Sequence, residues 1–315
     1  MTKILVTGNL GYIGSHTVRA LLDEGYDDII GIDNLHRGSM ANNYLRTHIT
    51  DIRNKDELRD IFKEVKPEVV LHFAALTSVP ESMEKPDEYY EVNVEGTQNL
   101  IEMMKEFNCS TLIFSSTASL YKQSKEPVRE TDVLQPLNNY ARNKMEVEQL
   151  IRQNSDWLNA IIFRYFNVVG WSEEYDSSRE IEKSNIVPSL IRAHMSGDKL
   201  KVYGNKYPIT RKDPNDHTCV RDYIDVRDIA NAYILALDYL KTHKGQEVFN
   251  LGTKDGASVL EIIKAFIEAN NIELDYEIVE PRKGDPAIVV ADNQKAKELL
   301  NWSPKYSLKE SLKLL

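Results

Sequence analysis

Residues 4–14 read ILVTGNLGYIG. The apolar, partly β-branched run Ile4–Val6 is typical of a strand that is buried on both faces. Gly8, Gly11 and Gly14 follow at the spacing of a phosphate-binding turn, and a helical pattern of apolar residues comes next. This order of strand, glycine turn and helix predicts the start of a Rossmann-type doubly wound α/β fold, with a pyrophosphate at the helix N-terminus.

A second predicted strand, residues 28–33, ends in an acidic residue. Asp33 follows Gly8 at close to the spacing at which a carboxylate accepts hydrogen bonds from the adenosine ribose of a dinucleotide. Its negative charge would repel the 2′-phosphate of NADP. The sequence therefore predicts NAD as the cofactor.

Strand and helix patterns alternate through the first half of the chain, which predicts a parallel sheet with helices on both faces. The predicted strands are residues 4–6, 28–33, 44–49, 69–75, 111–114 and 160–163, and the predicted helices are 13–22, 55–65, 88–107 and 138–153. After residue 165 the alternation stops, and a helix at 226–240 with a strand at 248–251 is expected to rejoin the first sheet.

The chain is thus expected to have two domains, the second a smaller C-terminal α/β substrate domain. The predicted NAD-binding domain comprises residues 1–166 and about 222–252, and the predicted substrate domain comprises 167–221 and 253–315.

Composition narrows the class of protein. The formal net charge of −10 argues against nucleic acid or an anionic membrane as the main partner. Cys109 and Cys219 have no metal-ligand spacing, so we expect a reduced, cytoplasmic protein without a metal site. We also expect neither a signal peptide nor a membrane span.

Two tyrosines are each followed by a lysine four residues later. Tyr140 and Lys144 open a long helical pattern and would share one helix face, where an ammonium group favours a phenolate that can act as a general base. Tyr121 and Lys125 have the same spacing, but Pro127 follows, so they need not share a helix. We therefore predict that Tyr140 and Lys144 are catalytic and that the other pair is structural.

Thr117 is the third predicted catalytic residue. It follows the strand at 111–114 on its carboxyl side, where open α/β sheets bind their ligands. Its hydroxyl can bridge a substrate oxygen and Tyr140.

With these motifs the chain resembles the extended short-chain dehydrogenase/reductases, and within them the UDP-glucose (UDP-galactose) 4-epimerase branch. The resemblance covers nearly the whole length. It rests on TGNLGYIG at 7–14, DNL at 33–35, DIRN at 51–54, FAA at 73–75, ESMEKP at 81–86, Asn93, SSTA at 115–118, Tyr140 with Lys144, RYFN at 164–167, VRDYI at 220–224, Arg282 with Gly284 and Asp285, and Asn301 with Trp302.

The resemblance implies tightly bound NAD. It assigns the pyrophosphate to Gly8, Gly11, Tyr12, Ile13 and Gly14, the adenosine ribose to Asp33 and Asn34, the adenine to Asp51 and Ile52, and the nicotinamide ribose to Lys144. It also assigns Phe73, Ala74, Ala75, Asn93, Ser115, Tyr140 and Phe166 to the cofactor site.

The resemblance also implies a UDP-sugar substrate. It assigns Thr117 to the sugar, Asn167, Asn185, Arg221 and Arg282 to the UDP, Tyr203 to the uracil and Asp285 to its ribose. The guanidinium fork of an arginine suits phosphate oxygens. By analogy with the family, the helices beginning at residues 88 and 138 would pair in a homodimer.

The implied reaction is NAD-dependent 4-epimerisation of a UDP-hexose by transient oxidation at C4. Tyr140 would take the proton of the sugar 4-hydroxyl while Thr117 positions that oxygen. NAD⁺ would take the C4 hydride and return it to the other face of the turned sugar. The protein holds and orients the cofactor, which carries the redox chemistry.

Several positions differ from the family pattern. Asn9 replaces a glycine of the turn, Thr77 replaces a lysine, and Pro80 replaces a glycine, while the segment 208–216 is longer than usual. Val289 aligns with a position whose bulk limits N-acetyl sugars, and a valine has room for them.

Three alternatives follow. UDP-N-acetylglucosamine 4-epimerisation stays open. A nucleotide-sugar dehydratase is disfavoured, because Ala118 and Ser119 replace the acidic pair of that branch. A catalytically silent NAD-binding regulator is disfavoured because the Tyr140, Lys144 and Thr117 set is intact.

Overall fold

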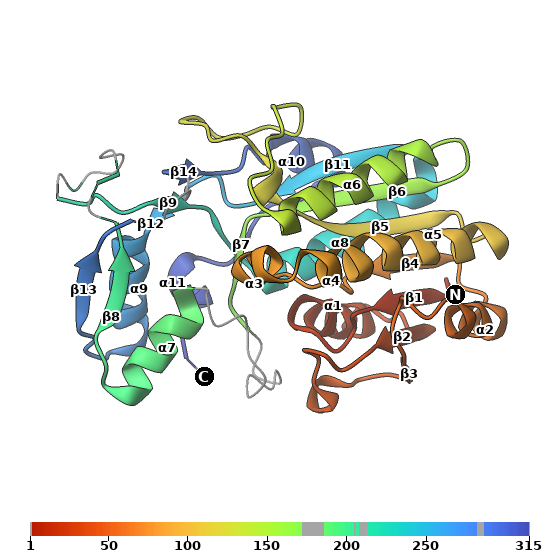
Figure 1. Cartoon of the computed structure of the whole chain (residues 1–315), viewed down its shortest axis with the longest axis horizontal. Helices are drawn as coiled ribbons and strands as arrows, with labels where there is room; N and C mark the ends of the chain where they lie inside the picture. Colours follow the sequence, from red (N-terminus) through yellow and green to blue (C-terminus); the bar gives the residue numbers. More distant parts are fainter. Residues whose placement is uncertain are drawn as a thin grey trace.

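A seven-stranded parallel sheet forms the centre of the computed structural model, which describes residues 2–171, 186–204, 206–207, 213, 215–281 and 287–314 (Figure 1). The strand order is β11-β6-β5-β4-β1-β2-β3. The strands are β1 Ile4–Thr7, β2 Ile29–Asp33, β3 Thr47–Ile49, β4 Val69–His72, β5 Thr111–Thr117, β6 Asn159–Tyr165 and β11 Gln246–Leu251. The predicted Rossmann-type fold is confirmed, and its order reverses between β1 and β4, where such sheets bind ligands.

Helices cover both faces of this sheet. On one face the core contains residues of α1 (Tyr12–Asp23), α8 (Val226–Thr242) and α10 (Gln294–Leu300). On the other face it contains residues of α2 (Lys55–Val65), α5 (Gly96–Glu106) and α6 (Asn139–Gln153). The sheet strands are apolar on both sides because each side faces a helix layer.

The helix predicted over 88–107 has three parts. It comprises α4 (Pro86–Tyr90), a π-helical segment η2 (Glu91–Glu95) and α5. Within η2, Asn93 is buried and bonds both backbone groups of Leu76: its Oδ1 accepts from the N–H at 2.8 Å and its Nδ2 donates to the carbonyl at 2.9 Å. The π-helical turn thus fixes the segment that follows β4.

The strand predicted over 69–75 ends three residues earlier, at His72. The N–H groups of Phe73 and Ala74 both donate to the Thr7 carbonyl, at 2.9 and 3.1 Å, which turns the chain away from the sheet ladder. Two short helices follow these strands along the chain: α3 (Val79–Glu84) comes after β4, and η3 (Ala118–Leu120) comes after β5.

A smaller part lies at the left of Figure 1 and has its own apolar core. It contains α7 (Ile186–Ser196), β8 (Leu200–Tyr203), α9 (Val259–Asn270), β13 (Tyr276–Val279) and α11 (Leu308–Ser311), with the short strands β9 (Val220–Arg221), β12 (Ala257–Ser258) and β14 (Ile288–Val289). A parallel pair, β7 (Asn167–Val169) and β10 (Tyr223–Asp225), follows β6 and leads into α8. As predicted, α8 and β11 return to the large sheet, where β11 pairs with β6.

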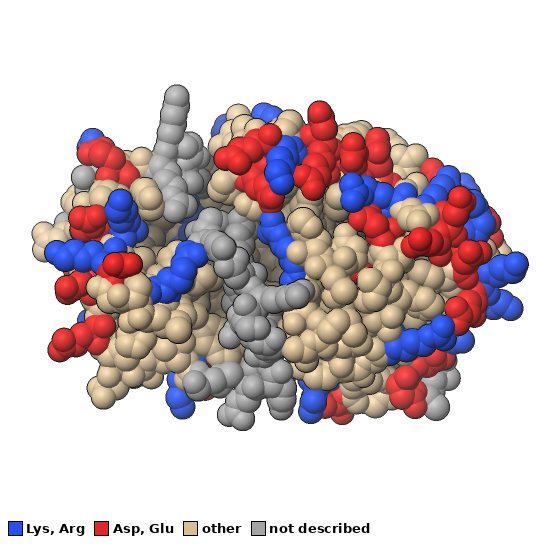
Figure 2. Space-filling view, turned by 60° about the horizontal axis from the view of Figure 1, so that its bottom comes forward, with Lys and Arg blue, Asp and Glu red and all other residues tan. Residues whose placement is uncertain are grey.

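The surface is charged with both signs. Figure 2 shows acidic and basic side chains interspersed on the larger part of the molecule. Within the described parts of the chain, none of the helices combines the length and the apolar character needed to cross a bilayer.

Candidate active site

The helix α6 carries both members of the predicted tyrosine–lysine pair. Asn138 caps this helix, because its Oδ1 accepts from the Ala141 N–H at 2.8 Å. Tyr140 packs against an apolar cluster of Leu76, Tyr89 and Val92. Leu76 and Val92 also line the cavity at the β1, β2 and β4 ends, so the predicted base lies beside this cavity.

Lys144 lies one turn further along α6 and is 3% exposed. Its Nζ donates to the Ser115 carbonyl at 2.8 Å and lies 4.7 Å from the centre of the Phe114 ring. Burial lowers the pKa of Lys144 to about 7, while the Glu148 charge opposes that shift. The lysine is thus fixed between α6 and the carboxyl end of β5.

Thr117 is the last residue of β5 and shares a strand face with Ser115. Its Oγ1 accepts from the Ser119 N–H at 3.1 Å, which begins η3. Its register partner on β6 is Tyr165. Burial raises the pKa of Tyr165, hydrogen bonds with Tyr233 and Ser115 lower it, and nearby Tyr140 raises it further, so Ser115 and Tyr140 both lie near the Tyr165 hydroxyl.

The neighbouring cavity contains many of the predicted cofactor residues. Those that line it are Gly8, Gly11, Asp33, Asn34, Asp51, Ile52, Phe73, Ala74 and Ala75. Lining residues that the sequence reasoning missed include His36, Arg37, Thr50, Arg53, Leu76 and Glu88. The signal available for His36 and Arg37 was their proximity to the acidic motif at 33–35, and Arg53 lies inside the motif at 51–54.

The glycine turn beneath this cavity fits a pyrophosphate. Gly8 has φ +73°, and a Cβ there would lie 2.6 Å from the Ala74 nitrogen. A Cβ on Gly14 would lie 2.1 Å from the Gly8 carbonyl oxygen. Because no side chain fits at either position, the turn leaves its backbone and the start of α1 open to an anion.

Two carboxylates border the cavity. Asp33 is buried and accepts from the N–H groups of Leu10 and Leu35, at 3.1 and 2.8 Å; burial raises its pKa and these bonds lower it. Asp51 accepts from Asn34 at 2.8 Å and from Arg53. Although burial raises the pKa of Asp51, these bonds hold it at about 2.

Asn9, which replaces a glycine of the family pattern in the turn, does not line the cavity. Its side chain lies beside Gly31, where a Cβ would be 2.4 Å from it, and its Nδ2 donates to Thr47 Oγ1 at 2.8 Å. Its Oδ1 has no hydrogen-bond partner among the described residues. Asn9 therefore joins the turn to β2 and β3.

The sequence reasoning also missed His72, the last residue of β4. Its Nδ1 lies 2.6 Å from Thr7 Oγ1 and its Nε2 lies 2.8 Å from Thr97 Oγ1. Thr97 donates to the Asn93 carbonyl, so it accepts from His72 Nε2–H. Burial lowers the pKa of His72 to about 3, so a neutral imidazole joins β1, β4 and α5 below the cavity.

The other predicted cofactor residues lie around this region. Tyr12 donates its hydroxyl hydrogen to the Gly170 carbonyl. Ile13 packs on the core beneath α1. Phe166 is buried, with its ring centre 6.4 Å from that of Tyr121.

The predicted substrate residues are only partly described. Asn167 is exposed at the start of β7, and its N–H donates to the Asp222 carbonyl at 2.8 Å, which places it beside β9 and Arg221. Tyr203 ends β8 and is 37% exposed. Asn185, Arg282 and Asp285 lie outside the described residues.

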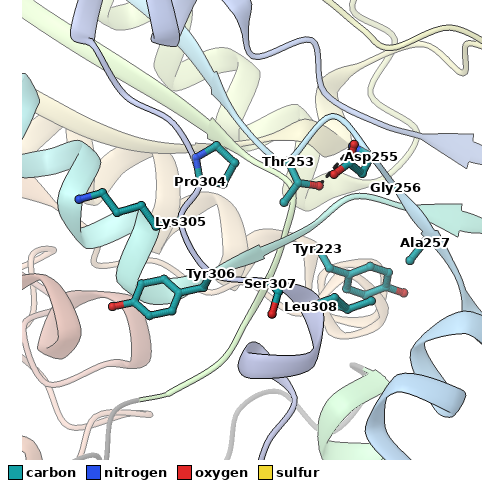
Figure 3. A pocket seen from close by; sticks show the side chains of 10 residues that line it. All are labelled: Tyr223, Thr253, Asp255, Gly256, Ala257, Pro304, Lys305, Tyr306, Ser307 and Leu308. Carbon is teal, nitrogen blue, oxygen red and sulfur yellow. Dashed lines mark hydrogen bonds between the residues drawn. The ribbon is translucent and has the colours of Figure 1, made fainter. Parts of the chain in front are cut away.

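A second hollow, of about 280 Å³, lies between β10, the segment after β11 and residues 304–308 (Figure 3). Thr253 and Asp255 point toward each other, and the Asp255 N–H donates to Thr253 Oγ1 at 3.4 Å. The side chains of Lys305 and Tyr306 point away from Thr253 and Asp255. None of the predicted site residues lines it, and we assign it no ligand.

Comparison with known proteins gives the class. Residues 4–252 match the model of the NAD dependent epimerase/dehydratase family, and the chain belongs to this family. The expected resemblance is confirmed, and with it an NAD-dependent enzyme of the nucleotide-sugar epimerase class.

Particular relatives are similar over almost their whole length. The chain is 36% identical to a UDP-glucose 4-epimerase of Lactobacillus helveticus, covering 96% of this chain and 92% of that one. A UDP-glucose-4-epimerase of Stenotrophomonas maltophila, solved with bound NAD and formylated UDP-arabinopyranose, has a TM-score of 0.92 at 32% identity, covering 99% and 96%. A UDP-glucose 4-epimerase of Bifidobacterium longum, solved with NAD⁺ and UDP, has a TM-score of 0.90 at 33% identity, with the same coverage.

Proposed function

We propose that this chain interconverts UDP-glucose and UDP-galactose by NAD-dependent epimerisation at C4, with Tyr140 as the base. One observation carries the assignment of the site. Tyr140 packs on Leu76 and Val92, which line the cofactor cavity, while Lys144 is anchored at the end of β5. The UDP-glucose 4-epimerase activity of the similar proteins, and the NAD and UDP compounds bound in their structures, support the substrate class.

Each side chain has a distinct task in this proposal. Tyr140 takes the proton from the sugar 4-hydroxyl, and Thr117 orients that oxygen. The charge of Lys144 favours the phenolate. Bound NAD supplies a reversible hydride acceptor, and Gly8, Gly11, Asp33 and Asp51 would hold it.

The substrate would lie between the two parts of the chain. We assign residues 1–166 and about 222–252 to NAD binding and 167–221 with 253–315 to the nucleotide sugar. The separate apolar core of the smaller part supports this division. Asn167, Asn185, Arg221 and Arg282 would hold the UDP, Tyr203 the uracil and Asp285 its ribose.

We further propose a cytoplasmic homodimer. Cys109 and Cys219 are buried, and no disulfide bond joins them, as in a reducing compartment. The α4 and α6 helices lie side by side, since the Tyr90 hydroxyl donates to Glu146 at 2.8 Å, and Tyr90 is 39% exposed. This helix pair would meet its copy across a two-fold axis.

A second substrate, UDP-N-acetylglucosamine, is favoured by one observation. Val289 on β14 is the register partner of Arg221, so a medium-sized side chain lies beside the proposed UDP contact. A valine leaves more room there than an aromatic residue.

Product analysis tests both candidates. Purified protein without added NAD is given UDP-glucose or, separately, UDP-N-acetylglucosamine, and the 4-epimers are quantified. Conversion of UDP-glucose supports the proposal, and conversion of both extends it to N-acetyl sugars. Conversion of neither, with NAD measured as bound, contradicts the proposed substrates.

A further inference from the structure

An ion pair beside the cofactor cavity joins the segment after β2 to the segment after β4. Arg37 lies in the segment after β2 and lines the cavity. Glu81 lies in α3, which follows β4. The Arg37 guanidinium donates to Glu81 Oε2. We call this pair the Arg37–Glu81 bridge.

The order of the strands in the sheet determines which part of the chain lies beneath the bridge. The strand β1 lies between β4 and β2, and all three run parallel. A link between the segments after β4 and β2 therefore passes over the carboxyl end of β1. That end continues into the Gly8 turn, where the pyrophosphate would bind.

The Glu81 end of the bridge is firmly positioned. The hydroxyl of Tyr89, a fully buried residue, donates to Glu81 Oε2 at 2.9 Å and accepts from the Ser78 N–H at 2.9 Å. Lys85 Nζ lies 3.3 Å from Glu81 Oε1. These bonds lower the pKa of Glu81 although burial raises it, so the group stays ionised near neutral pH.

The bridge is partly exposed to solvent. The Arg37 and Glu81 side chains are 34% and 27% exposed, so water reaches the pair from outside. Leu76, on the β4 side, and Gly38, on the β2 side, line the cavity with Arg37. The charge of Arg37 has the sign that attracts the pyrophosphate.

We propose that the Arg37–Glu81 bridge closes over bound NAD and slows its release. The proposal rests on NAD as the cofactor and on no particular sugar. Because ion pairs that water reaches contribute little to folding stability, breaking the bridge should leave the fold intact. The effect should instead lie in the dissociation rate of NAD, since the bridge must open before the cofactor leaves.

The experiment measures NAD release from the purified holoenzyme. The protein is diluted into an enzymatic trap that consumes free NAD, and the loss of bound NAD is followed over time. Arg37→Ala and Glu81→Gln should each release NAD about tenfold faster, as for loss of one charge-assisted hydrogen bond. The rate of NAD release from Arg37→Lys should lie between the rates of these two variants and the rate of the parent protein. Arg19→Ala, which removes an exposed 3.1 Å pair with Asp23 on α1, is the matched control and should release NAD at the parent rate.

The outcomes separate the bridge from simpler roles. Faster release in both Arg37→Ala and Glu81→Gln, with an unchanged unfolding midpoint, supports the bridge. Faster release in Arg37→Ala alone would mean that Arg37 acts on NAD by its charge, and it would overturn the bridge. Unchanged release in both variants would also overturn it. The readout is bound NAD, so a failure of the proposed sugar chemistry does not imitate any of these results.

Discussion

Arg164 on β6 and Glu148 on α6 form a two-pronged ion pair inside the protein. Arg164 Nε lies 2.9 Å from Glu148 Oε1, and Nη2 lies 2.6 Å from Oε2. Both side chains are 1% exposed. Ser116 on β5 also donates to Glu148 at 2.6 Å, so the carboxylate holds the proposed catalytic helix against two strands. Glu148 lies one helical turn after Lys144 on α6.

Removing this carboxylate should destabilise the protein strongly. Glu148→Ala leaves the buried Arg164 charge without its partner, and we expect a loss of about 3–5 kcal/mol in the free energy of unfolding. Urea denaturation measures it. Arg152→Ala is the control: Arg152 is half exposed and lies 3.3 Å from Glu148, so its loss should cost at most about 1 kcal/mol. Equal losses in the two variants would contradict this account.

Tyr140→Phe should abolish epimerisation while NAD stays bound. Loss of one positioned general base lowers kcat by about 10²–10⁴-fold. Product formation and the NAD content of the purified variant are the two measurements. Full activity would contradict the proposed mechanism.

Tyr121→Phe is the matched control, since Tyr121 has the same spacing to a lysine. Its hydroxyl donates to Asn250 at 2.6 Å and accepts from Arg164 at 2.9 Å, both inside the core. This variant should cost about 1–3 kcal/mol of stability and keep its chemistry.

The stability difference between the parent protein and Lys144→Met should depend on pH. In the NAD-free protein, burial lowers the pKa of Lys144 from 10.5 to about 7. Between these values the unfolded chain binds a proton that the folded chain lacks, so the parent protein gains stability relative to the variant as pH rises. His72, Tyr140, Tyr165 and Glu148 are the nearby titratable groups, and all are present in both proteins.

Urea midpoints at about pH 6.5 and about pH 9 check this sign. The stability of Lys144→Met relative to the parent protein should be highest at the lower pH. It should decrease at the higher pH. A constant gap would show that Lys144 titrates outside this range.

The glycines of the turn should respond differently to alanine. A Cβ on Gly11 would lie 3.4 Å from the Gly8 oxygen, an ordinary contact, so Gly11→Ala should fold normally and bind NAD more weakly because Gly11 lines the cavity. A Cβ on Gly14 would lie 2.1 Å from that oxygen, so Gly14→Ala should also lower the unfolding midpoint. Thermal melting and bound NAD distinguish the two. Equal unfolding midpoints for Gly11→Ala and Gly14→Ala would contradict the predicted difference.

Local sequence patterns predicted most of the fold. The helix at 55–65 has the bounds that its apolar spacing indicates, and the helix predicted over 138–153 spans Asn139–Gln153. The strand expected over 69–75 was too long. Apolar character continues through Ala75, but hydrogen bonds to Thr7 bend the chain after His72, and no local pattern reports a bond to a residue 66 positions away.

The sequence by itself determined the strand, glycine turn and helix at the N-terminus and the Tyr140–Lys144 spacing, because backbone geometry relates neighbours along the chain. Only the tertiary structure decided which distant groups meet: Glu148 with Arg164, His72 with Thr7 and Thr97, and Arg37 with Glu81. Helical periodicity can place Glu148 on the face of Lys144. It cannot supply a partner from another strand, because such contacts depend on strand order and on the packing of one layer against the next.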